Sequence, residues 1–186
     1  MIYLSRMIDQ DSPEDRLVFH LYNRSTDRRD LFIEHDNFII FIQKMQRQLA
    51  PVADIIAYCV MPNHFHVSLS PKHEVLIELP TEDVELQRLP TDELSEAVKR
   101  WLMGFTKSYN KHFNMTGSRF CQHTRCKQHR SVIDGINYIH DNPERANLVS
   151  HPGEWGYSSW AEHNGFVPDG EAICNLALVR KLTNSL

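Results

Sequence analysis

Two apolar runs separated only by the dipeptide Pro62-Asn63 constrain the fold of this 186-residue chain most strongly. Residues 54–61 and 64–69 are rich in β-branched and aromatic residues, which favour strands, and Pro-Asn is typical of a tight turn. The two runs therefore predict adjacent antiparallel strands. His64 and His66 lie in the second run, and we expect both imidazoles on one face because strand side chains alternate.

The flanking sequence predicts an α+β fold. Its elements are a strand over 16–23, an amphipathic helix over 35–49, a helix from 91 to about 113, a strand or hairpin over 118–127, and a short helix over 133–140 that ends near Asn142-Pro143. With the hairpin included, this order is a split βαβ pattern. It predicts a ferredoxin-like antiparallel sheet with helices on one face, followed by an irregular C-terminal tail with one last helix over 172–182.

The length favours one domain over residues 1–186. We expect a core over about 16–150, an acidic insertion over about 71–96 and a tail over 151–186. The longest apolar runs are too short to cross a bilayer, and the N-terminus lacks the order of charged and apolar residues in a signal peptide. The expected location is the cytoplasm, with no membrane partner.

Charge is strongly segregated although the net charge is only −4. Residues 71–97 hold eight acids and two basic residues, whereas residues 98–132 hold eight basic residues, five aromatics and no acid. Cations interleaved with rings suit a groove for single-stranded nucleic acid, because cations bind phosphates and rings stack on bases. The alternative is a solvated helix face with core aromatics. The candidate DNA contacts are Lys107, Lys111, Arg119, Arg125, Lys127 and Arg130.

Histidines and cysteines raise the question of a metal. His64 and His66 could form a bidentate site, or they could be a surface or half-buried pair. The four cysteines have irregular spacings, which favours reduced thiols. Cys121, His123 and Cys126 could form a zinc knuckle, although their spacing matches no standard ligand set.

Four motifs resemble those of a known family. They are CVMPNHFHV at 59–67, GSRFCQHTR at 117–125, YIHDNPERANLV at 138–149 and WGYSSW at 155–160. Together they resemble the single-tyrosine HUH transposases, and the branch they resemble most is the REP-associated tyrosine transposases, which bind hairpins of bacterial repetitive extragenic palindromes. The resemblance spans residues 17–160.

The resemblance implies a DNA strand transferase that cleaves single-stranded or hairpin DNA through a 5′-phosphotyrosine intermediate. Tyr138 matches the family's nucleophile, and His64 and His66 match its two metal ligands. Asn142, four residues after Tyr138, could supply a third ligand to Mg²⁺ or Mn²⁺. A tyrosine hydroxyl has a pKa of about 10 and is a weak nucleophile, so it needs an activated electrophile. The resemblance also implies association with the bacterial nucleoid and allows a homodimer.

Other interpretations stay open from the residues. Tyr138 could be a core tyrosine, and Tyr109 is a rival nucleophile on the longer helix. The fold could serve a hairpin-binding regulator with weak catalysis. A third alternative is a zinc-binding hydrolase or structural protein that gathers His64, His66 and the thiols of Cys121 and Cys126 around one metal.

Overall fold

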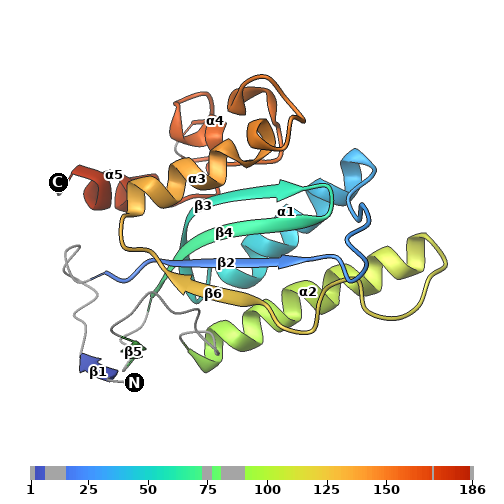
Figure 1. Ribbon diagram of the computed structural model, residues 1–186, viewed down its shortest axis with the longest axis horizontal. Helices are drawn as coiled ribbons and strands as arrows, with labels where there is room; N and C mark the ends of the chain where they lie inside the picture. Colours follow the sequence, from blue (N-terminus) through green and yellow to red (C-terminus); the bar gives the residue numbers. More distant parts are fainter. Residues whose placement is uncertain (1–2, 7–15, 73–76, 81–90, 169, 185–186) are drawn as a thin grey trace.

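The computed structural model describes residues 3–6, 16–72, 77–80, 91–168 and 170–184. In chain order its elements are β1 (Tyr3–Arg6), β2 (Phe19–Arg24), α1 (His35–Leu49), β3 (Ala53–Met61), β4 (His64–Pro71), β5 (Ile77–Pro80), α2 (Asp92–His112), β6 (Arg125–Gln128), α3 (Val132–Arg145), the 3₁₀ turn η2 (Pro152–Glu154), α4 (Trp160–His163) and α5 (Leu176–Asn184) (Figure 1).

The main sheet has the strand order β3-β4-β2-β6, and each neighbouring pair is antiparallel. Helix α1 connects β2 to β3 and α2 connects β4 to β6, so two split βαβ units interlock in one sheet. This order confirms the predicted ferredoxin-like α+β fold. A second, two-stranded sheet pairs β1 with β5 and was not anticipated from the sequence.

Side-chain alternation divides the sheet into two faces. Phe19 and Leu21 of β2 and Phe65 and Val67 of β4 are fully buried, in one cluster with residues of α1 and α2. The indole of Trp101 in α2 donates a hydrogen bond to the carbonyl of Phe41 in α1 at 3.1 Å, which satisfies the one polar group of this large buried side chain. This face is the main hydrophobic core.

The opposite face carries His64 and His66 and is only partly covered. Ile136 and Ile139 of α3 pack with Cys59 and Met61 of β3 in a second apolar cluster, to which α5 also contributes. Figure 1 shows α3 lying along β3, at the edge of the sheet farthest from β6. Helices α1 and α2 lie on one face, as predicted, whereas the predicted helices over 133–140 and 172–182 form α3 and α5 on the other, so helices pack on both faces of the sheet.

Two boundaries differ from the sequence prediction. Helix α3 continues past Pro143 to Arg145, because a proline inside a helix removes only one backbone donor and the adjoining turns remain bonded. The stretch predicted as an acidic insertion includes the end of β4, all of β5 and the first turn of α2, and its residues 73–76 and 81–90 lie outside the described residues. Thr91 caps α2 by accepting a hydrogen bond from the Leu94 amide at 2.9 Å.

The tail is more ordered than predicted. It contains η2, α4 and α5, and the last of these begins at Leu176 rather than 172. The buried carboxylate of Glu162 accepts hydrogen bonds from the Tyr58 hydroxyl and the Cys174 amide, both at 2.8 Å, which fastens the tail to β3. In the described part of the chain, no helix is both long and apolar enough to cross a membrane.

Candidate metal and nucleophile site

His64 and His66 lie on the same face of β4, with ring centroids 5.1 Å apart and ring planes at 90°. Nδ1 of His64 lies 2.6 Å from Oδ1 of Asn63. Because an amide oxygen can only accept, Nδ1 of His64 carries the proton and donates. The lone pair of the neutral His64 ring is therefore on Nε2, which is the nitrogen left for a ligand.

His66 has a different partner. Its Nδ1 lies 2.8 Å from Nε2 of His20, which projects from the neighbouring strand β2 onto the same face. Burial lowers the pKa of His66 to about 2, with smaller contributions from His20 and His64. Burial also lowers the pKa of His20 to about 3 and lowers that of His64. These rings are neutral near pH 7, which is the form that binds metal ions.

Tyr138 lies on α3, next to His66 and His20. Its ring centroid is 5.7 Å from that of His66 and 5.8 Å from that of His20, both in edge-on arrangements. The side chain is 42% exposed, so it is not a core tyrosine. The guanidinium of Arg145, two turns further along α3, lies 5.5 Å from the centre of the Tyr138 ring. The structure thus brings three predicted site residues together: His64, His66 and Tyr138.

His129 contacts both His20 and helix α3. Its ring stacks on that of His20, with centroids 5.5 Å apart and planes 13° apart. A Cβ atom at Gly135 of α3 would clash with the His129 ring, so only glycine fits there without a shift. Gly135 lies in the first turn of α3, so its close packing against His129 fixes the position of the start of the helix that carries Tyr138.

Asn142, the predicted third ligand, is not joined to the histidines. Its side-chain amide donates to the Tyr138 carbonyl at 2.6 Å, one turn back in α3. No hydrogen bond within the described residues links it to His64 or His66. Among those same residues, no group of three or more His, Cys, Asp or Glu side chains is arranged to hold a metal. The two imidazoles would fit a cation only with further ligands of another type, such as an amide oxygen, water or phosphate.

A cavity of about 450 Å³ opens beside His64. It is lined by Tyr22, Asn23, Arg24, His64, Cys121, Gln122, His123 and Arg125. The register pairs Arg24 with His64, Tyr22 with Arg125 and His20 with Lys127. Directly opposed residues share a face, so Arg125 and Lys127 of the predicted DNA set lie on the histidine side of the sheet. Arg24 joins them there, and the sequence did not single it out.

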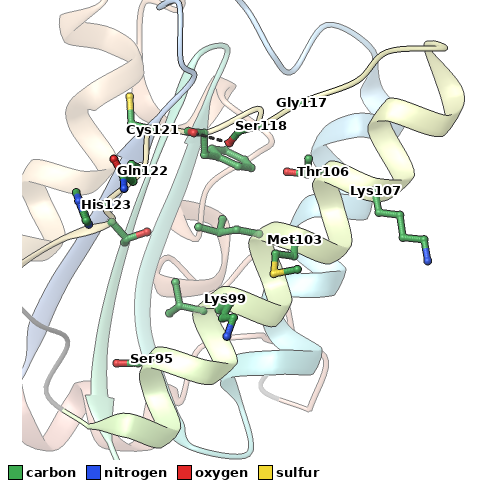
Figure 2. A pocket seen from close by; sticks show the side chains of 14 residues that line it. Ser95, Lys99, Met103, Thr106, Lys107, Gly117, Ser118, Cys121, Gln122 and His123 are labelled. Atoms are coloured by element: carbon green, nitrogen blue, oxygen red, sulfur yellow. Dashed lines mark hydrogen bonds between the residues drawn. The ribbon is translucent and has the colours of Figure 1, made fainter.

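The other predicted DNA contacts are spread more widely. Lys107 borders a second cavity of about 660 Å³ between α2 and residues 117–124. Figure 2 shows its side chain pointing outward from α2, away from Cys121, Gln122 and His123. Lys111 lies in the last turn of α2. The Arg119 guanidinium donates to the Thr116 carbonyl, and Arg130 is exposed just before α3. Cys121, Gln122 and His123 line both the cavity that Lys107 borders and the cavity beside His64, to which Arg125 contributes.

The structure contradicts two alternatives. Cys126 is fully buried in the core on the opposite face of the sheet from His64 and His66, so the thiols and imidazoles do not converge on one metal. All four cysteines are free thiols, as predicted. Tyr109 is 8% exposed and packs in the same core, on the face of the sheet opposite the histidines. It therefore does not lie beside them as a nucleophile would.

No family model matches the sequence, and no curated protein sequence matches it. Among solved structures, a REP-associated tyrosine transposase bound to a REP hairpin is similar over 90% of this chain and 86% of that chain, with a TM-score of 0.56 and 14% sequence identity. The two chains share one fold. The fold that the resemblance of the four motifs implied is therefore confirmed.

Several residues of the site were missed from sequence. His20 and His129 carry no motif of their own, and their place beside His66 and Tyr138 depends on strand register and on the start of α3. Asn63 stood next to His64 in the sequence, but only the structure shows that its oxygen faces the ring. For His20 a signal was available, because alternation along β2 sets it on the face opposite Phe19 and Leu21.

Proposed function

We propose that this protein is a metal-dependent DNA endonuclease and strand transferase that cleaves single-stranded or hairpin DNA with Tyr138 as nucleophile. The observation that supports this most directly is the exposed Tyr138 ring beside His66, on a face that also carries Arg24, Arg125 and Lys127. A hydroxyl, two neutral imidazoles and basic side chains in one place are the groups that phosphoryl transfer needs.

In the proposed reaction the Tyr138 hydroxyl oxygen attacks the phosphorus of one phosphodiester. The bond from phosphorus to the 3′ oxygen breaks, the tyrosyl proton is lost to solvent, and the leaving oxygen takes up a proton to become a 3′-hydroxyl. The 5′-phosphate stays on Tyr138 as a phosphodiester. Attack of a 3′-hydroxyl on that bond joins the strands and frees the tyrosine, so no nucleotide cofactor is consumed.

The residues of the site have separate roles in this proposal. Nε2 of His64 and Nε2 of His66 would hold Mg²⁺ or Mn²⁺, with the Asn142 side-chain oxygen as the proposed third ligand. A bound divalent cation would polarise the scissile phosphate and stabilise charge on the leaving oxygen. Arg145, close to the Tyr138 ring, would attract the phosphate to the nucleophile. Arg125 and Lys127 would bind the phosphates on either side.

One chain carries Tyr138 and both histidines side by side, which supports cleavage by Tyr138 of the same chain as the histidines. A homodimer is compatible with this arrangement and is not required by it. The REP-associated transposase of similar fold is bound to a REP hairpin, and a DNA hairpin flanked by single strands is accordingly the substrate to try first.

The test is cleavage of labelled hairpin-flanked single-stranded DNA in the presence of Mn²⁺ or Mg²⁺, read on a denaturing gel. We expect cleavage that stops on addition of a chelator and is lost in His64→Ala, while DNA binding persists in both cases. Binding without cleavage by the unmodified protein would favour the alternative of a hairpin-binding regulator. Unchanged cleavage by His64→Ala would contradict the metal role of this histidine.

A further inference from the structure

His20 forms the only hydrogen bond that the described residues give to Nδ1 of His66, at 2.8 Å. Both side chains are buried, with 9% and 6% of their surface exposed, so water does not replace either partner readily. A neutral imidazole has one protonated and one bare nitrogen. The contact therefore requires that one ring donates and the other accepts, and the direction decides what His66 can do.

The two directions have opposite consequences. If His20 donates, Nδ1 of His66 accepts and the single proton of His66 is on Nε2, where it blocks ligation of a cation. If His66 donates, Nε2 of His66 keeps its lone pair, and His20 accepts through Nε2 and carries its own proton on Nδ1. Only the second arrangement is compatible with a metal ligand at His66.

His64 provides an internal comparison. Its Nδ1 donates to the Asn63 oxygen at 2.6 Å, an arrangement in which the direction is fixed because the amide oxygen cannot donate. His66 is two residues further along the same face of β4 and holds its Nδ1 in a bond of similar length. The pair is symmetric if His20 accepts from His66 as Asn63 accepts from His64.

The ring of His20 is held firmly in its place. It stacks on His129 and lies 5.0 Å from the ring of Tyr22, centroid to centroid, while the edge of Tyr138 approaches from α3. His129 in turn packs against Gly135. These contacts restrict His20 from turning its Nε2 away from His66, so the hydrogen bond is built into the packing between β2, β4 and α3.

From these contacts we infer that His20 is a positioning residue, which accepts a hydrogen bond from Nδ1 of His66 and thereby keeps Nε2 of His66 unprotonated and aimed for a divalent cation. The inference rests on the metal site of the proposed function. It assigns His20 no contact with DNA and no ligand bond of its own. Loss of such an acceptor behind a ligating histidine typically weakens metal binding by about 10- to 100-fold.

Two variants separate this role from simple packing. His20→Gln retains an acceptor oxygen near the position of Nε2, whereas His20→Leu fills similar space without any acceptor. With Mn²⁺ as the probe, titrated by calorimetry into the DNA-free protein, we expect affinity within about threefold of the unmodified protein for His20→Gln and a loss of about 10- to 100-fold for His20→Leu. Equal affinity of His20→Leu and the unmodified protein would overturn the inference, as would equal weakening by both variants.

A second measurement needs no substitution. Nitrogen-15 NMR of the histidine side chains in the metal-free protein near neutral pH distinguishes a protonated from a bare ring nitrogen. We expect His66 to carry its proton on Nδ1 and His20 on its own Nδ1; a proton on Nε2 of His66 would overturn the inference. If the tautomers are as expected but the unmodified protein binds no Mn²⁺, the failure lies in the proposed metal site and not in the hydrogen bond.

Discussion

The ring of Tyr138 lies edge-on to the imidazole of His66, with centroids 5.7 Å apart and planes at 84°. Tyr138 lies on α3 and His66 lies on β4, and 72 positions separate the two residues in the sequence. Since both belong to one chain, the proposed nucleophile and the histidine pair lie side by side without a second subunit.

Mixing experiments can test whether one chain is sufficient. We expect that a mixture of Tyr138→Phe and His64→Ala shows no more cleavage of hairpin-flanked DNA than either variant alone, because neither chain has both groups. The measurement is the cleaved fraction of labelled DNA at several mixing ratios. Recovery of activity in the mixture would show that a tyrosine from one chain serves the histidines of another.

Basic residues on the histidine face should dominate DNA binding. Arg125→Ala is expected to weaken binding of single-stranded DNA and to reduce the slope of log affinity against log salt by about 0.7, the value for loss of one phosphate contact. Lys44→Ala is the matched control, since Lys44 lies on α1 on the other face of the sheet. Binding measured by fluorescence anisotropy at several salt concentrations gives both slopes, and equal effects of the two variants would argue against this face.

Stability should fall in mild acid because buried histidines must be neutral in the folded protein. Burial lowers the pKa of His140 from 6.5 to about 3, and the Nε2 atom of this residue is 2.8 Å from the Ser159 hydroxyl. Between pH 6.5 and pH 3, His140 is protonated in the unfolded chain but stays neutral in the folded chain. Its contribution to the free energy of unfolding is therefore complete above pH 6.5 and is lost as the pH falls toward 3.

For His140 alone the loss at pH 5 is about 2 kcal/mol. Urea unfolding of the unmodified protein and of His140→Gln at pH 8 and pH 5 measures it. The variant should be the less stable at pH 8 but should lose less stability between the two pH values. An identical loss in both proteins would contradict the assignment to His140.

The contact between Gly135 and His129 should determine how the start of α3 packs against the sheet. Gly135→Ala places a methyl group against the His129 ring and is expected to cost about 1–3 kcal/mol of unfolding free energy, as overpacking does. The double variant Gly135→Ala with His129→Ala should recover part of that loss, because the ring that clashes is gone. Denaturant unfolding of both proteins and of His129→Ala completes the cycle, and strict additivity would contradict the proposed clash.

Local patterns predicted the sheet, and long-range pairing decided the details of the site. The hairpin around Pro62-Asn63 and the periodicity of α1 and α2 are local features, and both are present as expected. By contrast, His20 reaches His66 across 46 residues of sequence, through a β2–β4 register that no local pattern fixes. The basic set shows the same limit: Arg125 and Lys127 reach the histidine face through their pairing with β2, whereas Lys107 and Lys111 stay on α2.

Asn142 illustrates a second limit. Helical spacing correctly set it one turn after Tyr138, but its amide is engaged with the backbone of that turn. Spacing along a helix fixes which residues share a face and does not fix which groups their side chains contact. Its role as a third ligand accordingly stays a prediction.

The proposed mechanism requires that Tyr138 forms a covalent bond to DNA. The most direct measurement is incubation of the protein with labelled hairpin-flanked single-stranded DNA and Mn²⁺, followed by a denaturing protein gel and mass spectrometry of the labelled peptide. We expect a covalent adduct on the peptide that contains Tyr138, and none in Tyr138→Phe although that variant still binds DNA. An adduct that persists undiminished in Tyr138→Phe, or DNA cleaved by the unmodified protein without any adduct, would contradict it.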